Sequence, residues 1–292
     1  MAKSSMSKIL DAIQKADDQE AGKLISAEID AIMRKYKLDD YDLVMLYDEN
    51  DQISNYHANA IYSHVTEGSS ERKNILLIIN SSGGRIEPAY KISKTLKRVS
   101  KEKFAAVIPR RAKSAATLIT LGADEVHMGM MSELGPIDPQ IAGLPALSLG
   151  NALELIADIS CKFPDSTNLL HKYLADQIPI RILGYYQRVN ESAVQYAERL
   201  LNGKKFPDKM TENNIADHFV NHYKDHSFVI DHEEAKELLG DIVIFESDEY
   251  KAADEIYKLL DMISFVAGID DRVFWIVGDK GNFHSRVEKD EG

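Results

Sequence analysis

Apolar residues in the first part of the chain recur at helical spacing. Proline is absent and glycine nearly so between residues 5 and 37. The repeating apolar positions are Met6, Ile9, Leu10, Ile13, Leu24, Ile25, Ile29, Ile32 and Met33. Such a period of three to four residues predicts helix over 5–37. This segment is either a hairpin of helices that leans on the body or a contact between subunits, and the pattern leaves both open.

Short apolar runs alternate with helical patterns between residues 73 and 128. The Ile-rich run KNILLIIN at 73–80 is typical of a strand buried on both faces. Helices are predicted over 87–99 and 113–122, and further strands over 103–109 and 124–128. A strand over 42–48 and a helix over 51–65 precede this unit. The order strand–helix–strand–helix–strand predicts an α/β fold with parallel pairing and right-handed crossovers.

The pattern changes after residue 128. Residues 129–146 have the composition of a loop, and most of the remaining chain has helical periodicity. The predicted helices cover 148–161, 166–178, 182–202, 211–223, 232–239 and 249–266, and strands are predicted over 242–245 and 272–278, the latter closing a terminal hairpin. We expect an N-terminal helical extension over 1–38 and one α/β domain over 39–292 with a helical C-terminal part.

Charge and cysteine content narrow the class of protein. The formal net charge is −12, which opposes the basic footprint that nucleic-acid binding needs, so we expect no nucleic-acid partner. No apolar stretch is long enough to span a bilayer, so no membrane insertion is expected. The single cysteine, Cys161, fits a reducing compartment, and the N-terminus lacks a signal-peptide pattern. These features predict a cytoplasmic protein, and no motif calls for a cofactor.

Two segments that follow successive predicted strands carry the candidate chemistry. The first is Ser81-Ser82-Gly83-Gly84, whose glycines allow a substrate to approach closely and expose backbone N–H groups that can bind an oxyanion. The second contains Ser114, at the start of a small-residue helix. Taken singly, the first segment is as consistent with a tight turn, and a lone Ser114 fits a helix cap far better than a nucleophile. Because the carboxyl ends of parallel strands meet at one sheet edge, however, the two segments are expected to converge there.

The stretch ILLIINSSGGRIEPAYKISKTLK, followed by AKSAATLITLGADEVHMGMMSELGPIDPQ, resembles the Clp-type serine peptidases and signal peptide peptidase A. Within that superfamily it is most similar to the serine dehydrogenase proteinase family, above all in LGPIDPQ. The resemblance is strong over 75–145 and weaker in DHSFVIDHEEAKELLG, and it does not cover the N-terminal helices.

This resemblance implies a fold, an activity and a set of site residues. It implies a ClpP/crotonase-like spiral of ββα units and a homo-oligomer, commonly a ring. It implies a serine peptidase that acts on peptides or proteins, with Ser114 as nucleophile and the N–H groups of Gly84 and Ala115 as oxyanion hole. Gly83 is expected to contact the substrate.

The general base is not fixed by the pattern. Clp-type enzymes place a histidine near the positions of Ile137 and Asp138, and none stands here. Asp138 is too acidic to replace it at neutral pH. Lys172 and Lys162 are at the distances that a lysine base, as in signal peptide peptidase A, would have, and Lys113 adjoins Ser114.

A histidine base is the other possibility. His226 aligns with a histidine of the family and has a suitable ordinary pKa. We rank Lys172 slightly ahead of His226, and we expect His127 to be structural. His218, His222 and His226 are spaced by four residues, but a helix over them is expected to end before Asp225, so we predict no metal site.

Two other functions remain open. A crotonase-type enzyme would use the same oxyanion hole on an acyl thioester and would need no serine. A scaffold would keep the fold without catalysis.

Overall fold

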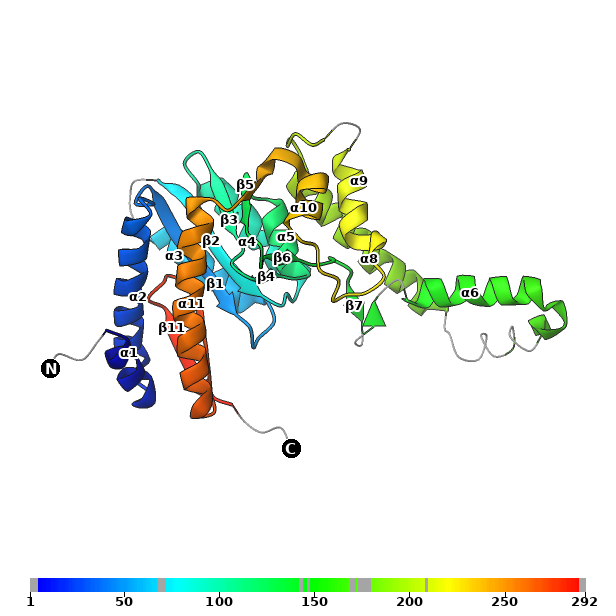
Figure 1. The fold of residues 1–292 in the computed structure, drawn as a ribbon. Coiled ribbons are helices and arrows are strands. Elements are labelled where there is room, and N and C mark those ends of the chain that lie inside the picture. Colours follow the sequence, from blue (N-terminus) through cyan, green and yellow to red (C-terminus); the bar gives the residue numbers. More distant parts are fainter. Residues whose placement is uncertain are drawn as a thin grey trace.

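The computed structural model describes residues 5–67, 72–141, 144–145, 148–168, 172, 180–207 and 210–288. Its centre is a mostly parallel sheet in the order β11-β10-β1-β2-β3-β5-β9 (Figure 1). The strands are β1 (Tyr41–Asp48), β2 (Asn74–Ser81), β3 (Phe104–Val107), β4 (Arg111–Ala112), β5 (Glu125–Met128), β6 (Glu133–Leu134), β7 (Gln140–Ile141), β8 (Leu144–Pro145), β9 (Val243–Phe245), β10 (Arg272–Gly278) and β11 (Phe283–Val287).

Helices cover both faces of this sheet. They are α1 (Ser5–Gln14), α2 (Asp18–Lys35), α3 (Asn55–Glu67), α4 (Ile86–Val99), α5 (Ala115–Leu121), α6 (Ser148–Lys162), α8 (Ile180–Leu201), α9 (Glu212–Asp217), α10 (His232–Leu239) and α11 (Asp248–Ile269). Short helical turns are η1 (Pro164–Ser166), η2 (His218–His222), a π-helical turn, and η3 (Gly240–Ile242). This arrangement confirms the predicted α/β class with a mostly parallel sheet.

The central strands are buried on both faces because their side chains alternate between two cores. In β1, Val44 and Leu46 face a core built with helices that include α3, α4, α5 and α8. Leu43 and Met45 face the other core, built with α1, α2 and α11. Successive side chains of a strand point to opposite faces, so an unbroken apolar run requires helices on both sides.

The N-terminal helices belong to the second of these layers. Ile9 in α1 and Ile25 and Ile29 in α2 are fully buried, in the same core as Ile256 of α11. Of the two possibilities left open by the sequence, the helices therefore lean on the body. The predicted domain boundary at residue 38 stays a prediction.

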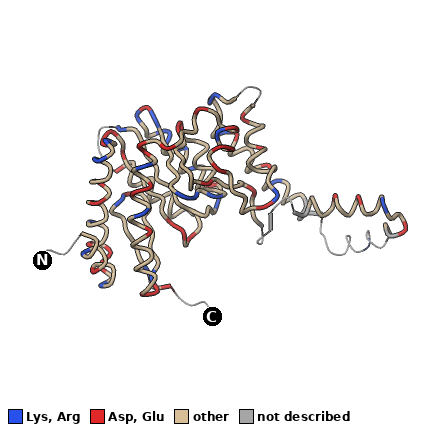
Figure 2. Tube along the Cα trace, viewed as in Figure 1, with Lys and Arg blue, Asp and Glu red and all other residues tan. Residues whose placement is uncertain are grey.

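Most predicted elements match the structure within a few residues. The predicted helix over 166–178 lies largely outside the described residues. α6 projects away from the body as an arm (Figure 1), and none of residues 150–162 is buried. Acidic and basic residues are interspersed along the described chain (Figure 2). Among the described helices, none combines the length and apolarity needed to cross a bilayer.

Candidate active site

Ser114 occupies a sharp turn between β4 and α5. It directly precedes α5 and has φ 51° and ψ −118°, a region that non-glycine residues rarely adopt. Its side chain makes no capping hydrogen bond to the helix. The interpretation of Ser114 as a helix cap is therefore wrong. A strained serine on a strand-to-helix turn is the geometry of a nucleophile elbow, which exposes the hydroxyl.

The glycine turn packs directly against this serine. Gly83 has φ +105°, and a Cβ added there would lie 2.6 Å from Lys113 O and 2.8 Å from Ser114 Cβ. Gly84 has φ +149°, and its added Cβ would lie 2.2 Å from Ile53 N. Because both positions exclude a side chain by conformation and by space, the turn requires its two glycines. The convergence expected from the order of the strands is thus present, since Ser81 of β2 pairs with Ala112 of β4.

Two backbone N–H groups remain available beside Ser114. The N–H of Gly83 donates to Ser81 Oγ at 3.2 Å and is occupied. Within the described part of the chain, the N–H groups of Gly84 and Ala115 have no hydrogen-bond acceptor. Ala115 is the first residue of α5, where N–H groups lack partners within the helix. These two donors can serve a developing oxyanion.

His226 is held by a buried carboxylate. Its Nδ1 lies 2.5 Å from Oδ1 of Asp138, which is only 5% exposed. Gln140 Nε2 donates to the other oxygen of Asp138 at 2.9 Å. With Nδ1–H donated to Asp138, Nε2 carries the free lone pair. The hydrogen bond to Asp138 raises the pKa of His226 above its ordinary value.

Ser114 and His226 line one cleft of about 650 Å³. Gly83 and Gly84 form part of the same lining, and Tyr185 of α8 contributes from the side of the arm. The hydroxyl of Ser114 has no hydrogen-bond partner among the residues the structure describes. The cleft thus brings together a strained serine, unoccupied N–H donors and an oriented imidazole.

The three candidate lysines are placed differently. Lys113 Nζ lies 3.1 Å from Glu133 Oε2 and donates to Phe228 O at 3.1 Å, so it ties the His226 segment to β6. Lys162 and Lys172 are exposed, and neither is among the described residues that line the cleft. The structure therefore brings His226, and not Lys172, to the cleft of Ser114.

Asp138 and Gln140 are the residues whose roles the sequence did not reveal. The sequence raises Asp138 only as a possible base, whereas in the structure it holds the His226 ring. The signal was present in LGPIDPQ, because this family-like segment contains both residues. His226, which both residues contact, lies 88 positions away from Asp138, so the spacing in the sequence does not indicate this contact.

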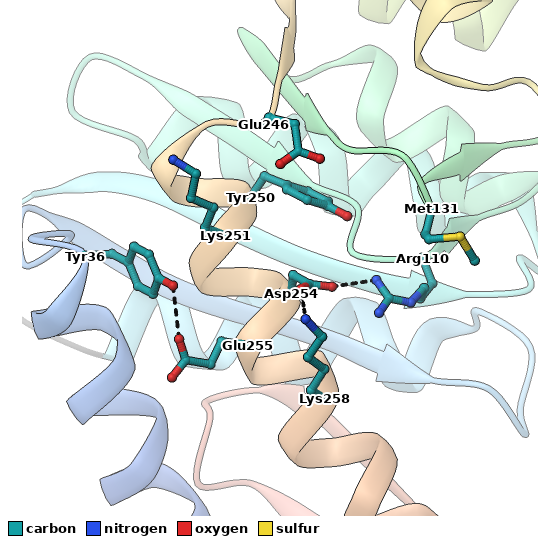
Figure 3. Close-up of a pocket in the computed structure, with 9 residues that line it drawn as sticks. All are labelled: Tyr36, Arg110, Met131, Glu246, Tyr250, Lys251, Asp254, Glu255 and Lys258. Carbon is teal, nitrogen blue, oxygen red and sulfur yellow. Dashed lines mark hydrogen bonds and ion pairs between the residues drawn. The ribbon is translucent and has the colours of Figure 1, made fainter.

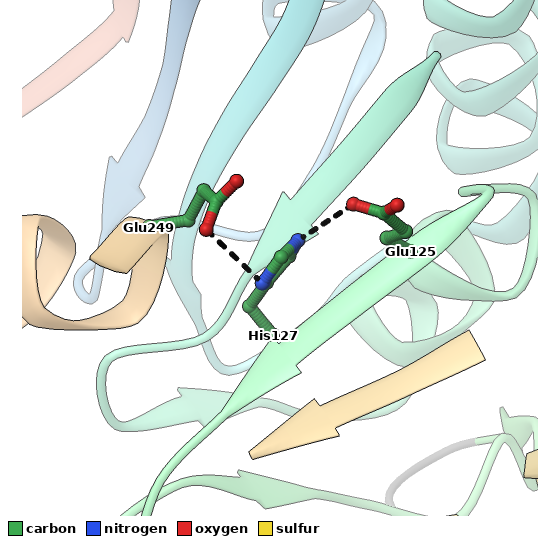
Figure 4. A group of neighbouring side chains, drawn as sticks. All are labelled: Glu125, His127 and Glu249. Carbon is green, nitrogen blue, oxygen red and sulfur yellow. Dashed lines mark hydrogen bonds and ion pairs between the residues drawn. The ribbon is translucent and has the colours of Figure 1, made fainter. Parts of the chain in front are cut away.

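A second polar cluster joins β5 to α11. The side chains of Glu125, His127 and Glu249 converge, with the carboxylates on opposite nitrogens of the ring (Figure 4). Lys103 Nζ pairs with Glu125 at 2.8 Å, and Ser247 Oγ lies 2.7 Å from His127 Nδ1. Burial lowers the pKa of His127. Because these groups are one another's hydrogen-bond and ion-pair partners, the cluster connects β5 to α11, as expected for a structural His127.

Another hollow, of about 500 Å³, lies on α11 away from Ser114 (Figure 3). Arg110 reaches Asp254 Oδ1 at 2.7 Å and stacks over Tyr257, with its guanidinium carbon 4.3 Å from the ring centroid. None of the predicted site residues lines this hollow among those described. Arg110 and Lys258 both pair with Asp254, and the Arg110 pair anchors the segment after β3 to α11.

A family model described as ClpP-like SDH-type serine proteinase matches residues 59–265, well over half of the chain. This match confirms the resemblance carried by residues 75–145. The uncharacterized protein MJ0137 of Methanocaldococcus jannaschii is 30% identical over 186 residues, which cover 64% of this chain and 59% of that protein. MJ1495 of the same organism is 31% identical over 131 residues, 44% of each chain. The chain thus spans about half the length of the curated relatives it matches.

Two solved structures of 1510-N, a membrane-bound stomatin-specific protease, are similar at 14% identity. One, a mutant, has a TM-score of 0.44 and covers 77% of this chain and 83% of that chain. The other, a mutant in complex with a substrate peptide, has a TM-score of 0.45 and covers 84% and 90%.

Proposed function

The chain belongs to the family of ClpP-like SDH-type serine proteinases, and we propose that it is a peptidase in which Ser114 is the nucleophile, His226 the general base and Asp138 the residue that orients the base. The observation that carries this proposal is the cleft shared by Ser114 and His226, with His226 held at 2.5 Å by a buried Asp138. This replaces the earlier preference for Lys172 as base.

In the acylation step, His226 Nε2 takes the hydroxyl proton of Ser114 while Oγ bonds to the substrate carbonyl carbon. The carbonyl oxygen becomes an oxyanion, which the N–H groups of Gly84 and Ala115 bind. The imidazolium then gives its proton to the leaving amine as the C–N bond breaks, which leaves an acyl-serine. Asp138 stabilises the imidazolium throughout, since its carboxylate accepts the hydrogen bond that Nδ1–H donates.

Deacylation repeats these roles with water. His226 removes a proton from a water molecule, whose oxygen attacks the acyl carbon and forms a second oxyanion at the same N–H donors. The proton returns to Ser114 Oγ as the ester bond breaks, and a carboxylic acid leaves. Loss of one oxyanion donor typically costs about 3–4 kcal/mol of transition-state stabilisation, so the two donors are a large part of the expected rate enhancement.

Labelling with a fluorophosphonate tests the nucleophile and the base together. The probe forms a bond from Ser Oγ to phosphorus with loss of fluoride, so wild type should label and Ser114→Ala should not. His226→Ala should label far more slowly. Lys172→Ala serves as the matched control and should label at the wild-type rate.

The outcomes separate the candidate functions. Labelling that survives Ser114→Ala would refute the assignment of the nucleophile. Loss of labelling in Lys172→Ala with normal labelling of His226→Ala would restore the lysine base. Binding of acyl-CoA that is unaffected by Ser114→Ala would favour the crotonase-type reaction.

We further propose that the substrate is a peptide or protein, that the chain forms a homo-oligomer and that it acts in the cytoplasm. Exposed apolar side chains support assembly: Leu155 and Phe163 on the α6 arm are 61% and 62% exposed, and Phe265 on α11 is 74% exposed. Light scattering during gel filtration measures the assembly, and a monomer at all concentrations would contradict it.

A further inference from the structure

A buried polar network lies behind the glycine turn and takes no direct part in the proposed chemistry. Asp48, the last residue of β1, and His57, in the first turn of α3, are each only 2% exposed. His57 Nε2 lies 3.1 Å from Asp48 Oδ2. Asp48 Oδ1 accepts the backbone N–H groups of Asn50 at 3.0 Å and Asp51 at 2.9 Å. Each oxygen of this buried carboxylate therefore has a defined partner.

The hydrogen bonds fix the tautomer of His57. Its Nδ1 accepts the backbone N–H of Ser54 at 3.1 Å. An accepting ring nitrogen carries no proton, so Nε2 is the nitrogen that donates to Asp48. Ser54 precedes α3 and His57 is its third residue, the position from which Glu or Gln makes this bond in a capping box. The network thus holds the backbone on both sides of Ile53.

Ile53 in turn holds the oxyanion turn. Its N–H donates to Gly83 O at 2.8 Å, and its carbonyl accepts the N–H of Arg85 at 2.9 Å. These two bonds lie on either side of Gly84, and Ile53 itself is fully buried. Since an added Cβ on Gly84 would lie 2.2 Å from Ile53 N, Gly84 rests directly on this backbone.

We infer that Asp48 and His57 are positioning residues for the Gly84 N–H, an inference that rests on the proposed function of Gly84 as an oxyanion donor. A donor stabilises the oxyanion only when it is placed to within about 0.5 Å. Asp48, His57 and Ile53 are buried, and hydrogen bonds of 2.8–3.1 Å connect them to the residues on either side of Gly84, so the network fixes the backbone against which Gly84 packs. The network acts on the transition state and not on substrate binding.

Asp48→Asn tests this inference at constant volume. An Asn at this position points its NH₂ either at the Nε2–H of His57 or at the N–H groups of Asn50 and Asp51, so a donor faces a donor in both orientations. His57 cannot respond by moving its proton, because Nδ1 must accept from Ser54. We expect kcat for p-nitrophenyl acetate to fall about 10- to 100-fold, as for a misplaced catalytic group, with KM within about threefold of wild type.

Two further variants serve as rescue and control. His57→Gln should retain more activity than His57→Ala, because Gln makes the same capping-box bond to Ser54. His64→Ala is the matched control, since His64 lies on the same helix and its Nε2 bonds Leu43 O at 3.0 Å, away from the turn. It should leave kcat unchanged while it lowers the free energy of unfolding.

Amide hydrogen exchange tests, without any substrate, whether Asp48 and His57 hold the backbone beside Gly84. In Asp48→Asn the N–H groups of Ile53 and Arg85 should exchange faster, while Ile75 N–H, bonded to Lys103 O at 2.9 Å, should not. Unchanged exchange at Ile53 and Arg85, or faster exchange with unchanged kcat, would overturn the inference. If wild type shows no Ser114-dependent hydrolysis, the proposed peptidase activity fails, and the exchange rates still decide whether Asp48 and His57 hold the turn.

Discussion

Replacing Asp138 by Asn tests its pairing with His226 without changing the side-chain volume. Oδ1 of Asp138 lies 2.5 Å from His226 Nδ1, and Oδ2 accepts Gln140 Nε2 at 2.9 Å. If the Asn NH₂ takes the Oδ1 position, His226 Nδ1 must accept, its proton moves to Nε2, and the ring can no longer take the proton of Ser114. If the NH₂ takes the Oδ2 position, Gln140 must turn its amide around, and the tautomer survives without its carboxylate.

The two arrangements bound the expected loss of activity. A wrong tautomer costs about 10⁴-fold in kcat in the serine-protease example, or about 5 kcal/mol at 1.36 kcal/mol per tenfold. Loss of the charge alone leaves the tautomer in place and removes only part of the general-base contribution, which is worth about 10²- to 10⁴-fold in all. Asp138 is 5% exposed but the His226 side chain is 35% exposed, so solvent screens the pair in part, and we expect a loss of about 10²- to 10⁴-fold.

Steady-state hydrolysis of p-nitrophenyl acetate between pH 6 and 9 measures this loss, with the rate of fluorophosphonate labelling as a second readout. Lys172→Ala is measured in parallel, because it should leave both rates unchanged. An Asp138→Asn protein that stays within about tenfold of wild type across this range would refute the role of Asp138.

Four more predictions follow from the same geometry. Activity should rise with pH with a midpoint above 6.5, because the hydrogen bond to Asp138 raises the pKa of His226 and the base must be neutral. The raised pKa also stabilises the fold at acid pH, and this stabilisation is lost as the pH rises through the pKa of His226 in the folded state. Chemical denaturation should show Ser114→Gly more stable than Ser114→Ala by about 1 kcal/mol, since only Gly relieves the positive φ. Gly84→Ala should lower the unfolding free energy by more than about 1 kcal/mol and abolish labelling, because its Cβ would meet the Ile53 backbone. Burial lowers the pKa of Lys204 to about 7, so above pH 7 the unfolded state binds more protons than the folded state. The unfolding free energy of wild type should therefore rise from pH 7 toward pH 10, and Lys204→Met should remove this rise.

The sequence predicts the sheet, and the convergence of the glycine turn with Ser114, because the signals for the individual elements are local. An apolar run such as ILLIIN is visible without knowledge of its neighbours, and parallel order follows from the alternation of elements. The convergence of Gly83 with Ser114 then follows from topology, since both come after the carboxyl ends of neighbouring strands. Their positive φ values, 105° and 51°, agree with the roles that the resemblance implied.

The proposed base could not be chosen from the sequence because the contacts of His226 are not local. His226 and Asp138 are 88 residues apart, and contacts such as the antiparallel bridge between Leu134 and Ile230 bring their segments together. The sequence favours Lys172 for its distance downstream of Ser114, and this lysine is exposed in the structure. Periodicity reports which face of a helix is apolar, and it does not report whether another element covers that face.

The chain contains one tryptophan and one cysteine, and their places make them optical reporters. Trp275 donates its indole N–H to Tyr56 at 3.3 Å, at the rim of a hollow of about 720 Å³ that Asp48 and His57 also line. Cys161 is exposed on the α6 arm. Indole emission therefore reports changes in the loop that supports the glycine turn, while a dye coupled to Cys161 reports changes in the α6 arm. Energy transfer from the indole to that dye reports changes in the distance between the two regions, and it needs no substitution to introduce a labelling site.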